Sequence, residues 1–255
     1  MPEQQDLELL IHGHTPILQI ETHEEKRALD LLVRIATQNV IPLFKWSVTE
    51  GLRRVDIDLG VQRHNAEPRD VLGHIKSSNV DGIYVLLDFD PYIEEPVNAR
   101  YVKEIAMQFE GGRNKLVFIS HKIDMPPGLS KRVARFELRL PDAKALEQII
   151  RDEAGKWQLE SGQRVATEPD TLQRLMRNLS GLTFNDARRL IRNVIVDDGA
   201  ITEGDLPEVM QAKYQLLNRD DVLSFEFETT RFSEVGGMRT LKRWLQQREK
   251  IFHRL

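Results

Sequence analysis

The sequence predicts an α/β protein in which a five-stranded parallel sheet, flanked by helices, precedes a smaller helical subdomain. Five short β-rich runs occupy the first 140 residues, and amphipathic helical stretches separate them. After Pro141 the apolar residues recur almost only at helical spacing. Strands that alternate with helices are typical of a parallel sheet. We therefore expect an α/β domain over residues 1–140, a helical subdomain over 141–218, and a separate closing segment over 219–255.

The strand-like runs differ in how continuously apolar they are. GIYVLLDF (82–89) and KLVFISH (115–121) are almost unbroken apolar runs, which indicates strands that are covered on both faces. The five runs together are residues 16–21, 43–48, 82–89, 115–121 and 135–140.

The intervening stretches have the spacing of helices that pack one face against a sheet. In EEKRALDLLVRIATQ (24–38), Leu29, Leu32 and Val33 recur at helical spacing, and PRDVLGHIKSS (68–78) behaves likewise. A third stretch, ARYVKEIAMQFEGG (99–112), ends in a glycine pair that is suited to a helix C-terminus. Right-handed crossovers between parallel strands then leave few possible topologies.

The helical subdomain carries three Thr-x-x-Asp sequences, each just before an apolar-periodic segment. A threonine followed three residues later by an acidic residue is typical of a capped helix N-terminus. The clearest of the following helices is NDARRLIRNVIV (185–196). The three sequences are Thr167–Asp170, Thr183–Asp186 and Thr202–Asp205.

Composition excludes several function classes. The 255 residues include no cysteine, so disulfides, thiolate metal sites and a cysteine nucleophile are all excluded. No apolar run approaches the roughly 20 residues that span a bilayer, and the acidic N-terminus is unlike a signal peptide. We expect a cytoplasmic protein without membrane contact. The net charge of −4 argues against nucleic acid as a partner. The segment from Arg231 is nevertheless basic, and we interpret it either as a solvated helix face or as a docking surface for an acidic partner.

The turn after the first strand lacks the features that bind phosphate. It reads THEEKRA (22–28), and no glycine occurs between Gly13 and Gly51. Residues with a Cβ disfavour the close backbone approach by which successive amides surround a phosphate. Glu24 and Glu25 would in addition place negative charge at the helix N-terminus, where an anion would bind. The sequence therefore predicts no phosphate binding at this turn.

The third strand ends in VLLDFDPY (85–92), whose pattern resembles a Walker B strand. Asp88 or Asp90 could hold Mg²⁺ through water, but without a phosphate loop we interpret both as helix caps or exposed turn residues. His121 occupies a sensor-like position at the end of the fourth strand, where a structural role is the simpler interpretation. His12, His14 and His23 lack matching ligands at metal-site spacing, so we expect no metal site in this chain. No Gly-x-Ser-x-Gly or His-Glu-x-x-His sequence occurs either, so we expect no catalytic residue.

The closing segment resembles the beginning of a further domain. FSEVGGMRTLKRWL (232–245) opens with a glycine pair and continues as a helical pattern. Its apolar stripe consists of Leu241, Trp244, Leu245, Ile251 and Phe252. Such a stripe is more often part of a core than of a cofactor site.

Several of these stretches together resemble one family. SGLTFNDARRLI (180–191) is similar to the lid of AAA+ ATPases, and FSEVGGMRTLK (232–242) resembles the segment just upstream of the Walker A loop in AAA proteins. The whole chain is similar to the N-terminal half of the bacterial and plastid AAA ATPases typified by a hypothetical chloroplast reading frame. The other stretches that carry this resemblance are IETHEEKRALDLL (20–32), GIYVLLDFDPYI (82–93), LVFISH (116–121) and FELRLP (136–141).

The resemblance implies a degenerate AAA+ module that precedes an active one. ATP and Mg²⁺ would be cofactors of the full-length parent, an ATP hydrolase, and this chain would need neither and would be inactive alone. Val235, Gly236 and Gly237 would lie near the adenine. The partners implied are the C-terminal AAA module of the same protein, further copies in a homo-oligomeric ring, and an unknown protein partner.

Three functions therefore remain open. The first is a non-catalytic regulatory or assembly domain of an AAA ATPase. The second is a free-standing adaptor similar to the degenerate subunits of clamp loaders, binding a protein partner or DNA; the V-G-G-M sequence favours the first over this one. The third is a degenerate pocket that binds nucleotide without hydrolysing it.

Overall fold

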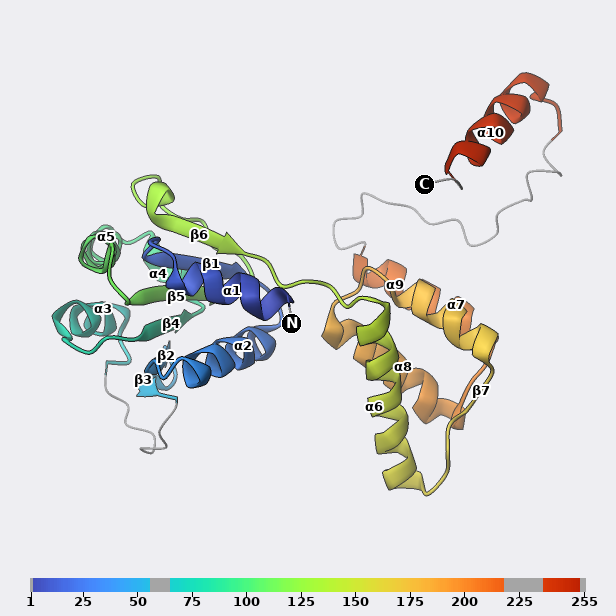
Figure 1. Cartoon of the computed structure of the whole chain (residues 1–255), viewed down its shortest axis with the longest axis horizontal. Coiled ribbons are helices and arrows are strands. Elements are labelled where there is room, and N and C mark those ends of the chain that lie inside the picture. Colours follow the sequence, from blue (N-terminus) through green and yellow to red (C-terminus); the bar gives the residue numbers. More distant parts are fainter. Residues whose placement is uncertain (1, 56–64, 218–235, 253–255) are drawn as a thin grey trace. The chain divides into compact units, whose positions relative to one another are not determined.

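A computed structural model describes residues 2–55, 65–217 and 236–252 of the chain (Figure 1). The chain divides into two compact units. The first comprises Met1–Asp152 together with Ser180–Arg189, and the second comprises Glu153–Leu179 together with Leu190–Leu255. Each unit has its own core and is considered separately.

The first unit is built on a sheet of six strands in the order β3-β2-β4-β5-β1-β6. Neighbouring strands run parallel throughout, except that β3 is antiparallel to β2. The predicted α/β class is confirmed, whereas the prediction of five parallel strands is corrected to six strands of mixed direction. The strands are β1 (Ile17–Glu21), β2 (Leu43–Ser47), β3 (Gly51–Arg54), β4 (Ile83–Leu87), β5 (Lys115–Ser120) and β6 (Val133–Phe136).

Among the elements of this unit that were not predicted, β3 and the N-terminal helix were missed for different reasons. β3 carries Arg53 and Arg54 and lies at the edge of the sheet, so its sequence lacks the apolar alternation that marks a buried strand. The N-terminal helix α1 (Pro2–His12) buries only two leucine or isoleucine side chains completely, those of Leu7 and Ile11. Charged and polar residues dominate the rest of α1, which weakens its helical pattern.

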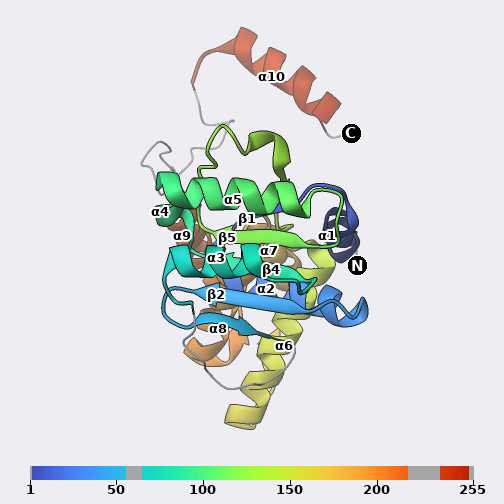
Figure 2. The ribbon, with the colours of Figure 1, turned by 90° about the vertical axis from the view of Figure 1, so that its left-hand side faces the viewer.

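Helices cover both faces of the sheet. The side chains of α1 and α2 pack in one apolar cluster, and those of α3, α4 and α5 pack in the other. Figure 2 shows the second layer, in which α3 and α5 lie side by side. The remaining helices are α2 (Glu25–Gln38), α3 (Pro68–Ser77), α4 (Asp90–Ile93) and α5 (Pro96–Phe109), with a 3-10 turn at Ser130–Arg132.

The central strands are apolar on both sides because each face has its own helical layer. In β4, Tyr84 and Leu86 enter one cluster while Ile83 and Val85 enter the other. This alternation follows from the two-residue period of a strand. Gly82 precedes β4 where the backbone leaves no room, since a Cβ there would lie 2.7 Å from the carbonyl oxygen of Pro42.

One buried charge lies at the start of β5. The side chain of Lys115 is 1% exposed, and its ammonium donates a hydrogen bond to the carbonyl oxygen of Gly13 at 2.6 Å. Burial lowers the pKa of Lys115, because an ammonium loses hydration in the interior.

The second unit is helical apart from a pair of two-residue strands. α7 (Pro169–Leu179) packs against α9 (Asp205–Leu217), and β7 (Ala166–Thr167) pairs in parallel with β8 (Ala200–Ile201). The expectation of an all-helical subdomain missed this pair because two residues carry no periodicity. α6 (Ala143–Ser161) and α8 (Phe184–Asp198) contribute residues to both units.

Two of the three predicted helix caps form. At the start of α8, the backbone N–H of Asp186 donates to Thr183 Oγ1 at 3.1 Å. Before α9, the backbone N–H of Thr202 donates to a carboxylate oxygen of Asp205 at 2.6 Å. The Thr167–Asp170 cap is not formed, because the Thr167 hydroxyl donates to the carbonyl oxygen of Glu168 at 3.4 Å instead.

The last described helix is α10 (Arg239–Phe252). Leu241, Trp244 and Leu245 are between 38% and 47% exposed, so this part of the predicted stripe is not covered within the described part of the chain. The guanidinium of Arg248 lies 3.9 Å from the centre of the Trp244 ring. None of the described helices combines the length and the apolar character that crossing a membrane requires.

Candidate functional site

The candidate site lies at the edge of the sheet where the parallel strands β1, β4 and β5 end. Parallel strands present their carboxyl ends at one edge, and α/β proteins bind ligands there. The residues that follow β1, β4 and β5 are Thr22, Asp88 and His121. Two hydrogen bonds extend the ladder past the strand ends, from the Thr22 N–H to the Ser120 carbonyl at 2.8 Å and from the Asp88 N–H to the Ile119 carbonyl at 3.0 Å.

The turn after β1 is held by its own side chains. The Glu24 backbone N–H donates to Thr22 Oγ1 at 2.9 Å, just before α2 begins. The Glu24 side chain is 4% exposed, and both of its oxygens have donors. Arg27 Nη1 donates to Oε2 at 2.8 Å, and the Asn185 backbone N–H donates to Oε1 at 2.9 Å, with both partners in the first unit.

Arg27 connects this turn to the N-terminal helix. Its Nη2 lies 2.6 Å and 2.8 Å from the two carboxylate oxygens of Glu3, and it also donates to the carbonyl oxygen of Arg139 at 3.0 Å. The guanidinium stacks over the Phe184 ring at 4.1 Å from its centre. We call Glu3, Glu24 and Arg27 the turn triad; its contacts are those of a structural ion-pair network.

The electrostatics of the turn oppose phosphate binding. Two glutamates stand at the start of α2, where a nucleotide phosphate would have to lie. The pKa of Glu25 is raised, first by partial desolvation and then by the nearby negative charge of Asp88. Lys45 is the cation that acts on Glu25, and it is ion-paired with Glu50.

The ends of β4 and β5 bring together a second set of polar side chains. Ser120 Oγ lies 2.6 Å from Asp90 Oδ1 and 3.3 Å from Asp88 Oδ1. A hydroxyl carries a single proton, so it can donate fully to only one of these carboxylates at a time. One ligand atom from each of Asp88, Asp90 and His121 lies within 4.8 Å of the other two. We call Asp88, Asp90 and His121 the strand-end cluster.

The local backbone explains why these side chains meet. β4 and β5 are neighbours in the sheet, and Leu87 pairs with Ile119, so the residues that follow them lie next to each other. Asp88 has φ +47°, a left-handed conformation that aspartate tolerates better than most residues. The ring of Phe89 is buried in the core, and Asp90 begins the short helix α4.

His121 has an aromatic neighbour from the turn after β1. The rings of His23 and His121 are nearly parallel, with an interplanar angle of 24° and centres 6.0 Å apart. From the sequence, Asp88, Asp90 and His121 were named as separate candidates, and their proximity was not predicted. No role was predicted for Ser120. The signal that could have done so is the rule that residues after neighbouring parallel strands share one edge. The Walker B-like and sensor-like roles of these residues stay predictions.

The glycine pair before α10 is only partly within the described residues. Val235 lies outside them, whereas Gly236 and Gly237 are exposed. Gly237 has φ +74° and is followed by Met238 with φ +51°, so the chain turns tightly into α10. Their expected place near an adenine stays a prediction.

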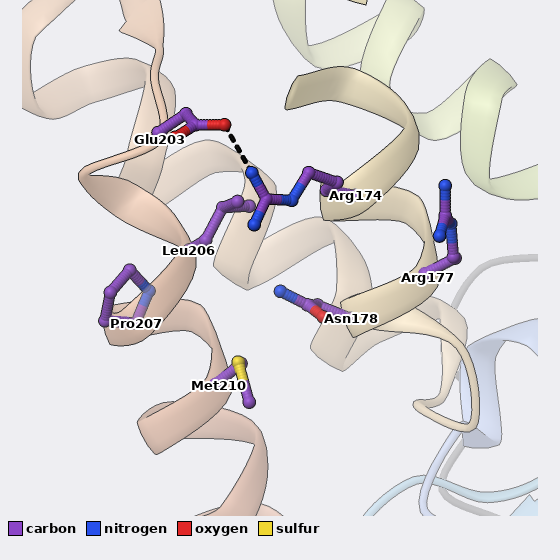
Figure 3. Close-up of a pocket in the computed structure, with 7 residues that line it drawn as sticks. All are labelled: Arg174, Arg177, Asn178, Glu203, Leu206, Pro207 and Met210. Carbon is purple, nitrogen blue, oxygen red and sulfur yellow. Dashed lines mark hydrogen bonds and ion pairs between the residues drawn. The ribbon is translucent and has the colours of Figure 1, made fainter. Parts of the chain in front are cut away.

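A shallow pocket of about 330 Å³ lies between α7 and α9 in the second unit. Figure 3 shows Arg174 ion-paired with Glu203 across it, with Arg177 on the same wall as Arg174. No feature of the sequence indicated this pocket. Its remaining lining residues are Asn178, Leu206, Pro207 and Met210.

Comparison with known families matches nearly the whole chain in two pieces. Residues 3–138 match the N-terminal domain, and residues 144–220 the second domain, of SpoVK-like AAA ATPases. The AAA domain-containing protein ycf46 of Pyropia yezoensis is 26% identical over 253 residues, which cover 97% of this chain and 49% of that protein. The ycf46 protein of Guillardia theta is 23% identical over 252 residues, covering 97% and 48%. The chain thus spans about half the length of the curated relatives it matches.

Solved structures show the same fold. The AAA domain of FIGL-1 in complex with ADP has a TM-score of 0.50 and 15% identity, over 82% of this chain and 75% of that chain. A HORMA–CdnC–Trip13 complex of E. coli MS115-1 gives a TM-score of 0.50 and 13% identity, over 81% and 76%. At these identities the likeness concerns the fold alone.

Proposed function

Because this chain belongs to the SpoVK-like AAA ATPase family, we propose that it is a non-catalytic assembly and regulatory part of an AAA ATPase. In this proposal ATP and Mg²⁺ act in a further AAA module, which occupies the other half of a protein as long as the ycf46 relatives. The chain keeps an AAA fold and contributes it as a scaffold, within a ring of identical subunits.

The observation that carries the proposal is the turn triad. Where a nucleotide-binding module needs glycines and unoccupied backbone amides, this turn has a buried glutamate whose two oxygens already accept hydrogen bonds. The Glu24 backbone N–H already donates a hydrogen bond to Thr22 Oγ1. Opening this arrangement for a phosphate would leave Glu24 and Arg27 without their partners.

The exposed face of α10 supports the assembly role. Leu241, Trp244 and Leu245 form an apolar stripe on a helix whose polar positions include Arg243 and Arg248. Exposed apolar patches of this kind mark protein contact sites more often than free surface. We propose that the AAA module of the same protein covers this stripe.

The test uses the 255-residue chain and the following AAA module as two separate proteins. We expect the chain alone to release no more phosphate from ATP than a heat-denatured sample does. We also expect the chain and the module to form a complex, detected by size-exclusion chromatography with light scattering. The double substitution L241A/L245A should weaken this association, whereas R243A on the polar side of α10 should not.

Two outcomes would contradict the proposal. Micromolar affinity of the chain alone for a fluorescent analogue of Mg-ATP would show that the turn after β1 admits phosphate. Failure of the chain to associate with the module, combined with saturable binding to DNA, would favour the adaptor function instead.

A further inference from the structure

We propose that Asp88, Asp90 and His121 form a binding site for one divalent transition-metal ion, with Zn²⁺ the best match. This inference goes beyond the assembly role and does not depend on it. It rests on the chemistry and convergence of three side chains from two neighbouring strand ends.

The distances within the strand-end cluster suit a shared ion. One ligand atom from each residue lies within 4.8 Å of the other two. Tetrahedral zinc ligands at about 2.0–2.2 Å from the ion are about 3.4 Å apart, so each ligand atom needs to move by roughly 1 Å or less. Asp88 and His121 are exposed and Asp90 is half-buried, so small side-chain rotations can close the site.

The charge balance of the cluster favours a cation. Asp88 and Asp90 share one hydroxyl donor, that of Ser120, and neither forms an ion pair with any residue in the described part of the chain. Glu25 adds a further carboxylate close enough to interact with Asp88; the ammonium of Lys45 also acts on Glu25, but it is itself ion-paired with Glu50. A divalent ion would offset the repulsion among these carboxylates, which a single hydroxyl proton cannot do.

The donor set indicates which ion. Mg²⁺ prefers six oxygen ligands and keeps several waters, whereas an imidazole nitrogen together with carboxylate oxygens suits Zn²⁺ and related transition metals. The site needs no phosphate, unlike a Mg²⁺ site that a nucleotide completes. With three protein ligands, a fourth position would remain for water or a partner's side chain.

The experiment is a titration of the metal-free 255-residue chain with Zn²⁺ alone, monitored by calorimetry. We expect one equivalent to bind, and D90N and H121A each to weaken binding by at least about tenfold. The double variant H12A/H14A is the matched control, because these histidines lie before β1 and outside the cluster. It should bind Zn²⁺ like the unmodified chain.

A second measurement keeps the proposal testable if a variant folds poorly. In the unmodified chain, the imidazole NMR signals of His121 should shift with the first equivalent of Zn²⁺, and equimolar Mg²⁺ should not reverse the shift. Unchanged His121 signals would overturn the proposal. So would equal binding by H121A and the unmodified chain, or loss of binding in H12A/H14A.

Discussion

The turn after β1 and the ends of β4 and β5 lie at the same edge of one sheet, yet they differ in how many hydrogen-bond donors each carboxylate has. In the turn, buried Glu24 has a donor on each oxygen, supplied by Arg27 and the Asn185 backbone. At the strand ends, Asp88 and Asp90 share the single proton of Ser120.

This difference separates structure from candidate function. A carboxylate whose hydrogen bonds are complete stabilises the fold and leaves nothing for a ligand. Carboxylates held close together with too few donors reduce stability, and proteins retain such arrangements mainly at functional sites. At this one edge of the sheet, the Glu24 carboxylate already has a donor on each oxygen, whereas Asp88, Asp90 and His121 are the side chains close enough together to hold a cation.

The largest effect is expected for R27A in the turn triad. Removing this guanidinium leaves the buried Glu24 carboxylate and the partly buried Glu3 carboxylate without their cation. We expect the free energy of unfolding to fall by about 3 kcal/mol, measured by urea denaturation. R34A, an exposed arginine on the same helix, should change it by less than about 0.5 kcal/mol. Equal effects of the two substitutions would remove the distinction between the two regions.

A smaller loss is expected for S120A at the strand ends. The substitution removes the one donor that Asp88 and Asp90 share, while water can still reach both carboxylates. The free energy of unfolding should fall by about 1 kcal/mol. S130A, which removes an exposed hydroxyl bonded to the Pro127 carbonyl, should have almost no effect in the same assay. A loss as large as that of R27A would mean that the strand ends are structural too.

The smallest change is expected for D88N, and its sign is opposite. Asparagine accepts the left-handed backbone at φ +47° and removes one negative charge from beside Asp90 and Glu25. Stability at neutral pH should rise by about 0.5 kcal/mol while Zn²⁺ binding weakens. The control D30N changes an exposed carboxylate on α2 and should alter neither quantity. Destabilisation by D88N would contradict the view that this carboxylate is kept at a cost.

Much of the first unit could be predicted because its central strands are covered on both faces. Continuous apolar runs as short as those of β4 and β5 are typical of buried strands, and the resemblance to AAA ATPases that the sequence indicated is confirmed by the family matches. β3 could not be found, because Arg53 and Arg54 on an edge strand leave no periodic signal.

The residues of the candidate site could be predicted from the sequence, but their proximity could not. Its residues could be named, since Asp88, Asp90 and His121 each follow an apolar run. Their meeting depends on β4 and β5 being adjacent, which is a property of strand order and not of any local pattern. The hydrogen bond from the Asn185 backbone N–H to Glu24 likewise joins residues that are distant in sequence.

The strand order also has a consequence for how the chain folds. β1 is the first strand to be synthesised, but both of its neighbours, β5 and β6, are among the last strands of the sheet. β1 therefore has no strand partner until the chain has been made as far as Ser120, and it lacks its second partner until Phe136. Contacts this distant in sequence slow folding, so we expect insertion of β1 between β5 and β6 to be a late step, during which β1 is open to mispairing or to a chaperone.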